Sequence, residues 1–340
     1  MPEYSIVVPV YDEEDSLPEL VRRVRAVADG LDGATEVILV DDGSRDRSYE
    51  LMMDARLADP RFKVIRLSRN FGHQVAITAG LDWAVGRAVV VMDADLQDPP
   101  ELIPEMARMW RAGFDVVYAV RTQRTADPVI KRWTAALFYK LLRRLTELEL
   151  PINAGDFRLV DRKALDAFKQ MRERNRYVRG MFRWVGFRQA GVEYIREERY
   201  AGQTKYPLRK MVRLAIDAIV SFSDTPLRAA LNLGLVLAVL SMLLGAVAIG
   251  LKVAGVYTVP GWTSIVVLVA FLGGVQLLVL GVIGEYLARI QDEVRQRPLY
   301  LTQEMHGITA PRESGPGGLA SRAAAPTPTD SARLSITLEE

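Results

Sequence analysis

The sequence predicts an α/β domain with a mostly parallel sheet, followed by helices at and within a membrane. Up to about residue 200, short apolar runs alternate with amphipathic stretches, which is the pattern of strands joined by helices. A basic amphipathic stretch follows, and then two long apolar segments. The chain has 340 residues, enough for one large domain or two ordinary ones.

Short apolar runs mark the strands, and amphipathic segments such as Ser16–Asp29 and Ser48–Ala58 mark the helices between them. The expected strands are Tyr4–Val8, Glu36–Val40, Lys63–Leu67, Ala88–Met92 and Asp115–Tyr118. Strands that alternate with helices form sheets covered by helices on both faces, and ligands bind beyond the carboxyl ends of the strands.

The composition excludes several kinds of site. The chain has no cysteine, which rules out disulfides and thiolate metal sites, and its only histidines are His73 and His306, which argues against a multi-histidine zinc site. A net charge of +2 is too small to argue for a nucleic-acid partner. No signal peptide is expected, because the N-terminus enters a strand at Tyr4.

Acidic residues gather where the predicted strands end. Asp41-Asp42-Gly43-Ser44 follows the second strand, and Asp93-Ala94-Asp95 with Gln97 follows the fourth. Two carboxylates on alternate residues and a nearby amide suit Mg²⁺ or Mn²⁺, and such a cation keeps positions open for substrate phosphates. The alternative is structural: aspartates at strand ends cap turns, and Asp42-Gly43 has the sequence of an ordinary turn.

The second half of the chain points to a membrane. In the stretch from Arg199 to Arg228, basic residues alternate with apolar ones, as in helices that lie in a membrane interface; the alternative is a surface helix of the first domain. Residues 229–251 and 253–284 carry no charge and are long enough to span a bilayer. Arginines flank their outer ends, so the large N-terminal domain and both termini are expected to be cytoplasmic, in a multi-pass protein of the cell inner membrane.

These patterns divide the chain into five parts. The expected boundaries are 1–205 for the α/β domain, 206–228 for interface helices, 229–252 and 262–288 for two transmembrane helices, and 306–340 for a disordered tail. Small residues in the two spans permit close helix packing, within one chain or in a homo-oligomer. These residues are Gly245, Gly250, Gly273, Gly274, Gly281 and Gly284.

The ordered motifs resemble those of glycosyltransferase family 2, whose members have a Rossmann-like GT-A fold. The resemblance covers about residues 4–300 and is nearest to the polyprenyl-phosphate glycosyltransferases, in particular the two-span bactoprenol glucosyltransferase branch. The motifs that carry it are Val8–Glu14, Val40–Asp46, Arg69–Gln74, Asp93–Asp98, Asn153–Arg158, Arg199–Pro207 and Arg295–Tyr300.

The resemblance implies roles for the residues at these motifs. The donor would be bound by Pro9, Tyr11, Glu13, Val40, Asp42, Asp93, Ala94 and Arg121, and the cation by Asp93, Asp95 and Gln97. The catalytic residues would be Asp95, Asp156, Arg199 and Lys205, and Arg132 is a further candidate for holding an anionic substrate. Asp156 is interpreted as a positioning residue or a base, with a helix N-cap before 157–168 as the structural alternative. His73 is interpreted as a structural histidine.

The predicted function is the transfer of a single sugar from a nucleoside-diphosphate sugar to polyprenyl phosphate, with inversion. Undecaprenyl phosphate is the expected acceptor and UDP-glucose the first choice of donor, on resemblance alone. One alternative is a processive polysaccharide synthase, but Gly180 stands where the Gln-x-x-Arg-Trp motif of such enzymes has its glutamine. A second alternative is a non-catalytic membrane scaffold of the same fold.

Overall fold

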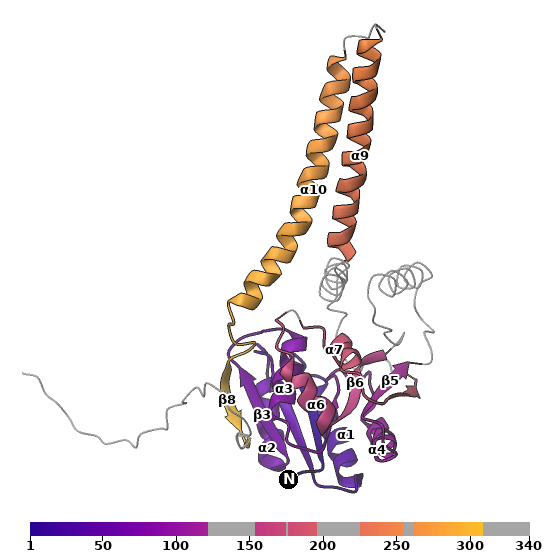
Figure 1. The fold of residues 1–340 in the computed structure, drawn as a ribbon. Coiled ribbons are helices and arrows are strands. Elements are labelled where there is room, and N and C mark those ends of the chain that lie inside the picture. Colours follow the sequence, from indigo (N-terminus) through magenta and orange to yellow (C-terminus); the bar gives the residue numbers. More distant parts are fainter. Residues whose placement is uncertain (122–153, 175, 196–224, 255–260, 309–340) are drawn as a thin grey trace, which may run out of the picture. The chain divides into compact units, whose positions relative to one another are not determined.

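A mixed eight-stranded sheet is the centre of the structure (Figure 1). The computed structural model describes residues 1–121, 154–174, 176–195, 225–254 and 261–308. In this part of the chain the strand order is β7-β5-β6-β4-β1-β2-β3-β8. The strands are β1 (Tyr4–Val10), β2 (Thr35–Asp41), β3 (Phe62–Leu67), β4 (Ala88–Val91), β5 (Val116–Arg121), β6 (Ala154–Asp161), β7 (Gln189–Tyr194) and β8 (Thr302–His306).

The five predicted strands are present, with ends shifted by a few residues, and β1 to β4 pair in parallel as expected. Three further strands were not predicted. Of these, β6 runs antiparallel to β4 and β5, and β8 runs antiparallel to β3, so the sheet is mixed. Because Asp156 lies within β6, the expected helix at 157–168 and the N-cap interpretation are wrong; that helix begins at Arg162, and its N-cap is Asp161.

Helices cover both faces of the sheet, and strand alternation decides which residues each face buries. On β1, Ile6 and Val8 pack toward one core, whereas Val7 packs toward the other. The first core receives α1, α2 and α4, and the second receives α3, α6 and α7. The helices are α1 (Leu17–Gly30), α2 (Ser48–Ala58), α3 (His73–Trp83), the 3₁₀ turn η1 (Pro100–Leu102), α4 (Ile103–Arg111), α6 (Arg162–Gln170) and α7 (Val178–Trp184).

Helix α3 lies unusually close to the sheet, and Gly80 is the reason. A Cβ at Gly80 would stand 2.2 Å from Cγ1 of Val7 and 3.1 Å from Cγ2 of Val40. Glycine therefore lets α3 pack directly on β1 and β2. This contact fixes the N-terminus of α3, and with it His73, at the carboxyl edge of the sheet.

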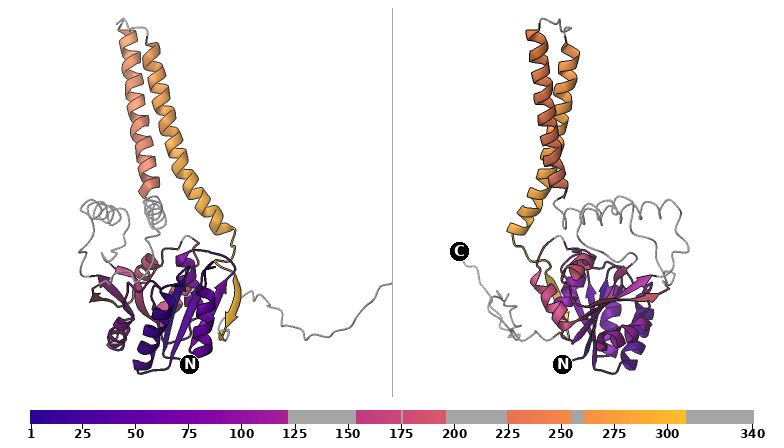
Figure 2. Two further views of the ribbon diagram at one scale, coloured as in Figure 1. Left: turned by 180° about the vertical axis from the view of Figure 1, so that it is seen from behind. Right: turned by 45° about the vertical axis from the view of Figure 1, so that its right-hand side comes forward.

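Two long helices, α9 (Thr225–Val253) and α10 (Trp262–Val294), lie side by side (Figures 1 and 2). By length and composition, one segment among the described residues could cross a membrane, Phe271–Val294, and none of that segment is buried. Among the described residues of α9, the shorter run Leu227–Leu237 is also apolar. The second predicted span therefore stays a prediction.

The chain after α10 returns to the sheet. β8 pairs with β3, Val64 opposite His306 and Ile65 opposite Met305 (Figure 1). Tyr300 donates a hydrogen bond to Oδ2 of Asp82 at 3.1 Å, and Ser68 N donates to the carbonyl of Leu301 at 2.9 Å. His306, expected at the start of the tail, is instead the last residue of an edge strand.

Candidate active site at the carboxyl edge of the sheet

The carboxyl ends of β1, β2 and β4 meet at one edge, as the parallel pairing requires. The loops beyond these strands leave the sheet in strained conformations. Asp12 after β1 and Leu96 after β4 are non-glycine residues with positive φ, 50° and 58°. Such residues persist only where surrounding contacts fix the loop, and they concentrate at functional sites.

An acidic cluster lies just beyond the carboxyl end of β4 and at the N-terminal end of the antiparallel strand β6. Nε2 of His73, the first residue of α3, is 3.3 Å from Oδ1 of Asp93 and 3.6 Å from Oδ2 of Asp156. The imidazole thus contacts two carboxylates from different strands of the sheet. Although His73 was interpreted from the sequence as a structural histidine, the structure places it between two of the predicted site residues.

Charge explains the protonation of this cluster. Burial lowers the pKa of His73, but the carboxylates of Asp93 and Asp156 outweigh it and raise that pKa to about 9. His73 is therefore an imidazolium at neutral pH. Burial raises the pKa of Asp93, and the negative charges of Asp98 and Asp156 add to that rise. Asp93 is thus a carboxylate whose charge the described protein groups compensate poorly.

Asp156 is in the opposite situation. Burial would raise its pKa, but Arg179 on α7, 3.4 Å from Oδ1, and His73 hold the pKa well below the usual range. Arg158 stands 3.8 Å away, and Gln74 donates to Oδ2 at 3.3 Å. A carboxylate held in this way stays ionised and is a poor proton acceptor.

A second group of polar residues joins the cluster to β5 and β7. The Tyr194 hydroxyl donates a short hydrogen bond to Oδ1 of Asp98 and accepts one from Nε of Arg121 at 3.1 Å. Gly155 leaves room for Arg121, because a Cβ there would stand 3.1 Å from Nη2 of that arginine. Arg121, predicted to touch the donor, is therefore anchored beside the acidic cluster.

The predicted cation ligands can be tested against this geometry. Among the residues the structure describes, no three His, Asp or Glu side chains are arranged to hold a metal ion without help. Oδ1 of Asp93 is buried and makes no hydrogen bond, while Oδ1 of Asp95 accepts one from Gln97 N at 3.2 Å. A buried carboxylate oxygen that makes no hydrogen bond, although the His73 imidazolium lies 3.3 Å away, fits a cation that takes its remaining ligands from a substrate diphosphate.

The acidic residues beyond β1 and β2 are used differently. Asp42 accepts hydrogen bonds from Phe71 N at 2.7 Å and from Gly72 N at 3.0 Å, one on each carboxylate oxygen. It thereby fixes the loop before α3. The adjacent turn needs glycine, because Gly43 has φ +73° and a Cβ there would be 2.7 Å from the backbone of Arg69.

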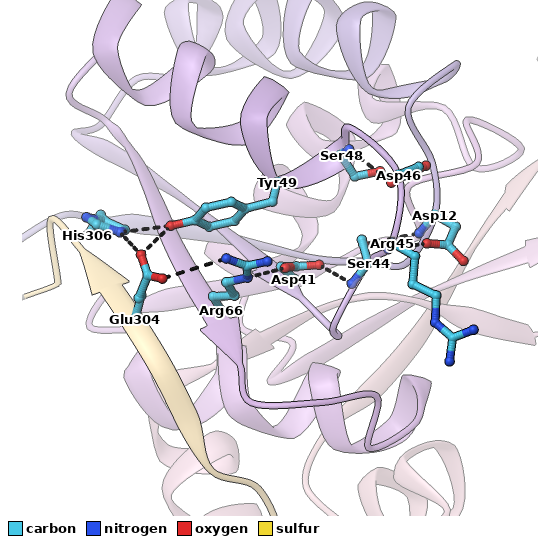
Figure 3. A network of polar contacts seen from close by, with 10 residues as sticks. All are labelled: Asp12, Asp41, Ser44, Arg45, Asp46, Ser48, Tyr49, Arg66, Glu304 and His306. Atoms are coloured by element: carbon cyan, nitrogen blue, oxygen red, sulfur yellow. Dashed lines mark hydrogen bonds and ion pairs between the residues drawn. The ribbon is translucent and has the colours of Figure 1, made fainter.

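Ionic contacts connect this turn to β8 (Figure 3). Oδ1 of Asp41 accepts a hydrogen bond from Ser44 N at 2.8 Å, and its Oδ2 is 3.3 Å from Nε of Arg66. Nη1 of Arg66 is 3.7 Å from Glu304 on β8, which also accepts a 2.7 Å hydrogen bond from the Tyr49 hydroxyl. β8, which follows α9 and α10 in the chain, therefore helps to hold the turn at Asp41–Ser44 in place at the edge of the candidate site.

The remaining predicted site residues differ in how accessible they are to a ligand, and three of them lie outside the described residues. Tyr11 and Glu13 lie half-exposed after β1, whereas Pro9 is buried within that strand and Ala94 is 5% exposed. The side chain of Val40 is fully buried against α3, so only its backbone is available to a ligand. Arg132, Arg199 and Lys205 lie outside the described residues.

Several site residues were not predicted: Gln74 as a contact of Asp156, together with Asp98, Arg158, Arg179 and Tyr194. Arg158 was inside a recognised motif, and its spacing of two from Asp156 would put both on one side of a strand, had β6 been recognised. Nothing in the local sequence points to Arg179, because its contact joins α7 to β6 across the fold.

A buried acidic cluster beyond the carboxyl ends of parallel strands defines an α/β enzyme that binds its ligand at this edge. Residues 5–168 match Glycosyl transferase family 2. The uncharacterized glycosyltransferase YkcC of Bacillus subtilis is 50% identical over 90% of this chain and 95% of its own length. The bactoprenol glucosyl transferase derived from prophage SfII in Shigella flexneri is 40% identical over 89% of this chain and 98% of its own length.

This chain belongs to glycosyl transferase family 2, and it is a glycosyltransferase. Among solved structures, glucosyl-3-phosphoglycerate synthase from Mycobacterium tuberculosis, in complex with UDP, resembles it with a TM-score of 0.44 and 18% identity. That likeness covers 64% of this chain and 78% of the other. It is too distant to bear on ligands.

Proposed function

We propose that this glycosyltransferase moves a single glucose from a nucleoside-diphosphate sugar to polyprenyl phosphate. The observation that carries the proposal is the 40% identity to a bactoprenol glucosyl transferase over almost the whole of that relative. UDP-glucose is the proposed donor and undecaprenyl phosphate the proposed acceptor. Direct in-line attack by the acceptor phosphate inverts the anomeric carbon.

The donor diphosphate would lie beside Asp93 and Asp95. These residues, with Gln97, would hold Mg²⁺ or Mn²⁺, and the unbonded Oδ1 of Asp93 supports this. When bound, the cation supplies Lewis-acid stabilisation of the departing diphosphate. The His73 imidazolium adds a positive charge at the same place, and its ionic contacts orient the carboxylates of Asp93 and Asp156.

Asp156 would act as a positioning residue and not as a base. Its pKa is held low by Arg179 and His73, and a polyprenyl phosphate is already anionic near neutral pH. What the acceptor needs is orientation and charge compensation. Arg199 and Lys205 are proposed for that task from their motif, and Arg121 is proposed to face the donor.

The proposed membrane arrangement has two spans and a cytoplasmic catalytic domain. Support comes from β8, which follows α10 in the chain and pairs with β3, which precedes both long helices. If α10 crosses the membrane once, the chain must cross a second time for β8 to reach β3. Helix α9 covers the other predicted span, so an α9–α10 hairpin meets this requirement.

The test is transfer of radiolabelled glucose from UDP-glucose to undecaprenyl phosphate by the purified full chain in vesicles. A lipid carrying one glucose is the expected product. A polymer would support a processive synthase instead, and the absence of any product with UDP-, GDP- and other nucleotide sugars would support a non-catalytic scaffold. Parallel calorimetry with the same sugar nucleotides identifies the donor independently of turnover.

A further inference from the structure

A basic cavity lies at the end of α10, and no residue of the acidic cluster lines it. Its volume is about 310 Å³. The lining comes from three separate segments: the loop before α3, the stretch between α6 and α7, and the chain at and after the end of α10. The charged and aromatic residues that line it are Arg69, Phe71, Arg174, Asp292, Arg295 and Arg297.

Positive charge in this cavity exceeds negative charge. Of the four guanidinium groups, that of Arg295 is 4.0 Å from the carboxylate of Asp292, and the backbone N of Arg174 donates to the carboxylate of Glu293 at 2.7 Å. Within the described parts of the chain, no carboxylate forms an ion pair with Arg69, Arg174 or Arg297. Arg69 instead stacks on the Phe71 ring at 4.0 Å, and Arg174 donates to the backbone carbonyl of Arg297. Guanidinium groups gathered without counter-charges favour the binding of an anion.

The place of the cavity in the chain indicates which anion. Arg295 lies seven residues after position 288, the expected end of the second span, which is about 10 Å of helix. Residues this close to the end of a span lie at or just outside the lipid headgroups. Arginine also suits phosphate, because its planar fork can donate two parallel hydrogen bonds to phosphate oxygens.

We propose that this cavity binds the headgroup phosphate of an anionic phospholipid. The proposal rests on the membrane arrangement described under the proposed function, but not on the chemistry of sugar transfer. The bound phosphate would bridge the end of α10 to the loop that carries Arg69 and Phe71. That loop is the one fixed by Asp42 at the edge of the active site.

The test is binding of radiolabelled phosphatidylglycerol to the full chain in detergent. The informative variant is Arg69→Gln with Arg297→Gln, because neither guanidinium forms an ion pair in the described parts of the chain. Arg69 donates one hydrogen bond, to the backbone carbonyl of its neighbour Asn70 at 3.0 Å. The matched control is Arg22→Gln with Arg108→Gln, which removes two exposed arginines, each paired only with a glutamate three residues earlier.

The cavity variant should bind phosphatidylglycerol at least about tenfold more weakly, as expected for losing charge-assisted hydrogen bonds. The control should stay within about twofold of the wild type, because exposed charges contribute little. Equal affinity of the two variants would overturn the proposal.

Competition separates the sources of phosphate. Phosphatidylcholine and inorganic phosphate should displace the label poorly; efficient displacement by inorganic phosphate would identify a free-phosphate site. Displacement by undecaprenyl phosphate at lower concentration than by unlabelled phosphatidylglycerol would make the cavity part of the acceptor site and contradict the proposal. Wild-type protein that binds phosphatidylglycerol but transfers no sugar would contradict the proposed function and leave this inference intact.

Discussion

Two acidic regions at the same edge of the sheet use the same residue type in different ways. Beyond β1 and β2, the carboxylates of Asp12, Asp41 and Asp42 accept hydrogen bonds from backbone N–H groups and fix loops. Beyond β4 and β6, Asp93 and Asp156 face each other across the His73 imidazolium. An aspartate whose oxygens accept hydrogen bonds from backbone N–H groups supports the structure. Aspartates that surround the His73 imidazolium instead create a local electrostatic potential that can act on a bound ligand.

The largest effect is expected at Asp95. The change Asp95→Asn keeps the shape of the side chain but removes its negative charge, so transfer should fall at least about 100-fold if the carboxylate holds the cation. Chelation should inactivate the wild type, with rescue by Mg²⁺ or Mn²⁺. The matched change Asp46→Asn, in the β1/β2 region, should leave kcat within a few-fold; full activity in chelator would contradict the metal assignment.

The next effect concerns stability and should appear at Asp42. The change Asp42→Ala leaves the N–H groups of Phe71 and Gly72 without their acceptor, so the free energy of unfolding should fall by about 2 kcal/mol. Urea unfolding measures this, with Asp95→Ala as the comparison. If Asp95→Ala destabilises the fold more than Asp42→Ala, the division between a structural and a chemical region is wrong.

His73 should give a smaller effect with a distinct pH dependence. His73→Gln removes the positive charge beside Asp93 and Asp156, and kcat should fall about tenfold. In chelated protein, the raised pKa of His73, about 9 against an ordinary 6.5, stabilises the fold. This stability is fully present below pH 6.5 and is lost as pH rises through 9. Thermal midpoints of wild type and variant should therefore converge at alkaline pH; a constant difference would contradict the assigned protonation.

The smallest effect is expected at β8. Glu304→Gln removes the ion pair with Arg66, and the KM for the sugar nucleotide should rise about threefold at unchanged kcat, because part-exposed ion pairs contribute less than ~1 kcal/mol. Gln303→Ala, an exposed neighbour on the same strand, is the control. A fall in kcat without a change in KM would show that β8 does not act through the turn that follows β2.

The sequence predicted five strands from their short apolar runs and missed β6, β7 and β8. Ala88–Val91 is an uninterrupted apolar run, but β6 places Asp156 and Arg158 inside a fully buried strand. These charges serve the site and break the pattern by which strands are recognised. β8 was missed because it is a short, polar edge strand, held by its pairing with β3.

Prediction of the site residues was limited in a similar way: local motifs could be recognised, but contacts between distant elements could not. Asp93, Asp95 and Asp156 could be predicted as site residues because they stand in short motifs at strand ends or within a recognised segment. The roles of His73 and Arg179 could not be found from local sequence, because each depends on a contact between elements distant in the chain. The burial of Val40 likewise follows from the close approach of α3, which only Gly80 allows.

The central claim is that the region beyond β4 and β6 carries out transfer while the region beyond β1 and β2 holds the loops. The most direct measurement compares kcat for glucose transfer to undecaprenyl phosphate by Asp156→Asn and Asp41→Asn, with sugar-nucleotide affinity and thermal midpoint recorded for each. The account predicts that Asp156→Asn lowers kcat at least about 100-fold while still binding sugar nucleotide, and that Asp41→Asn lowers the thermal midpoint but keeps kcat within a few-fold. Equal losses of kcat in the two variants, or full kcat in folded Asp156→Asn, would contradict it.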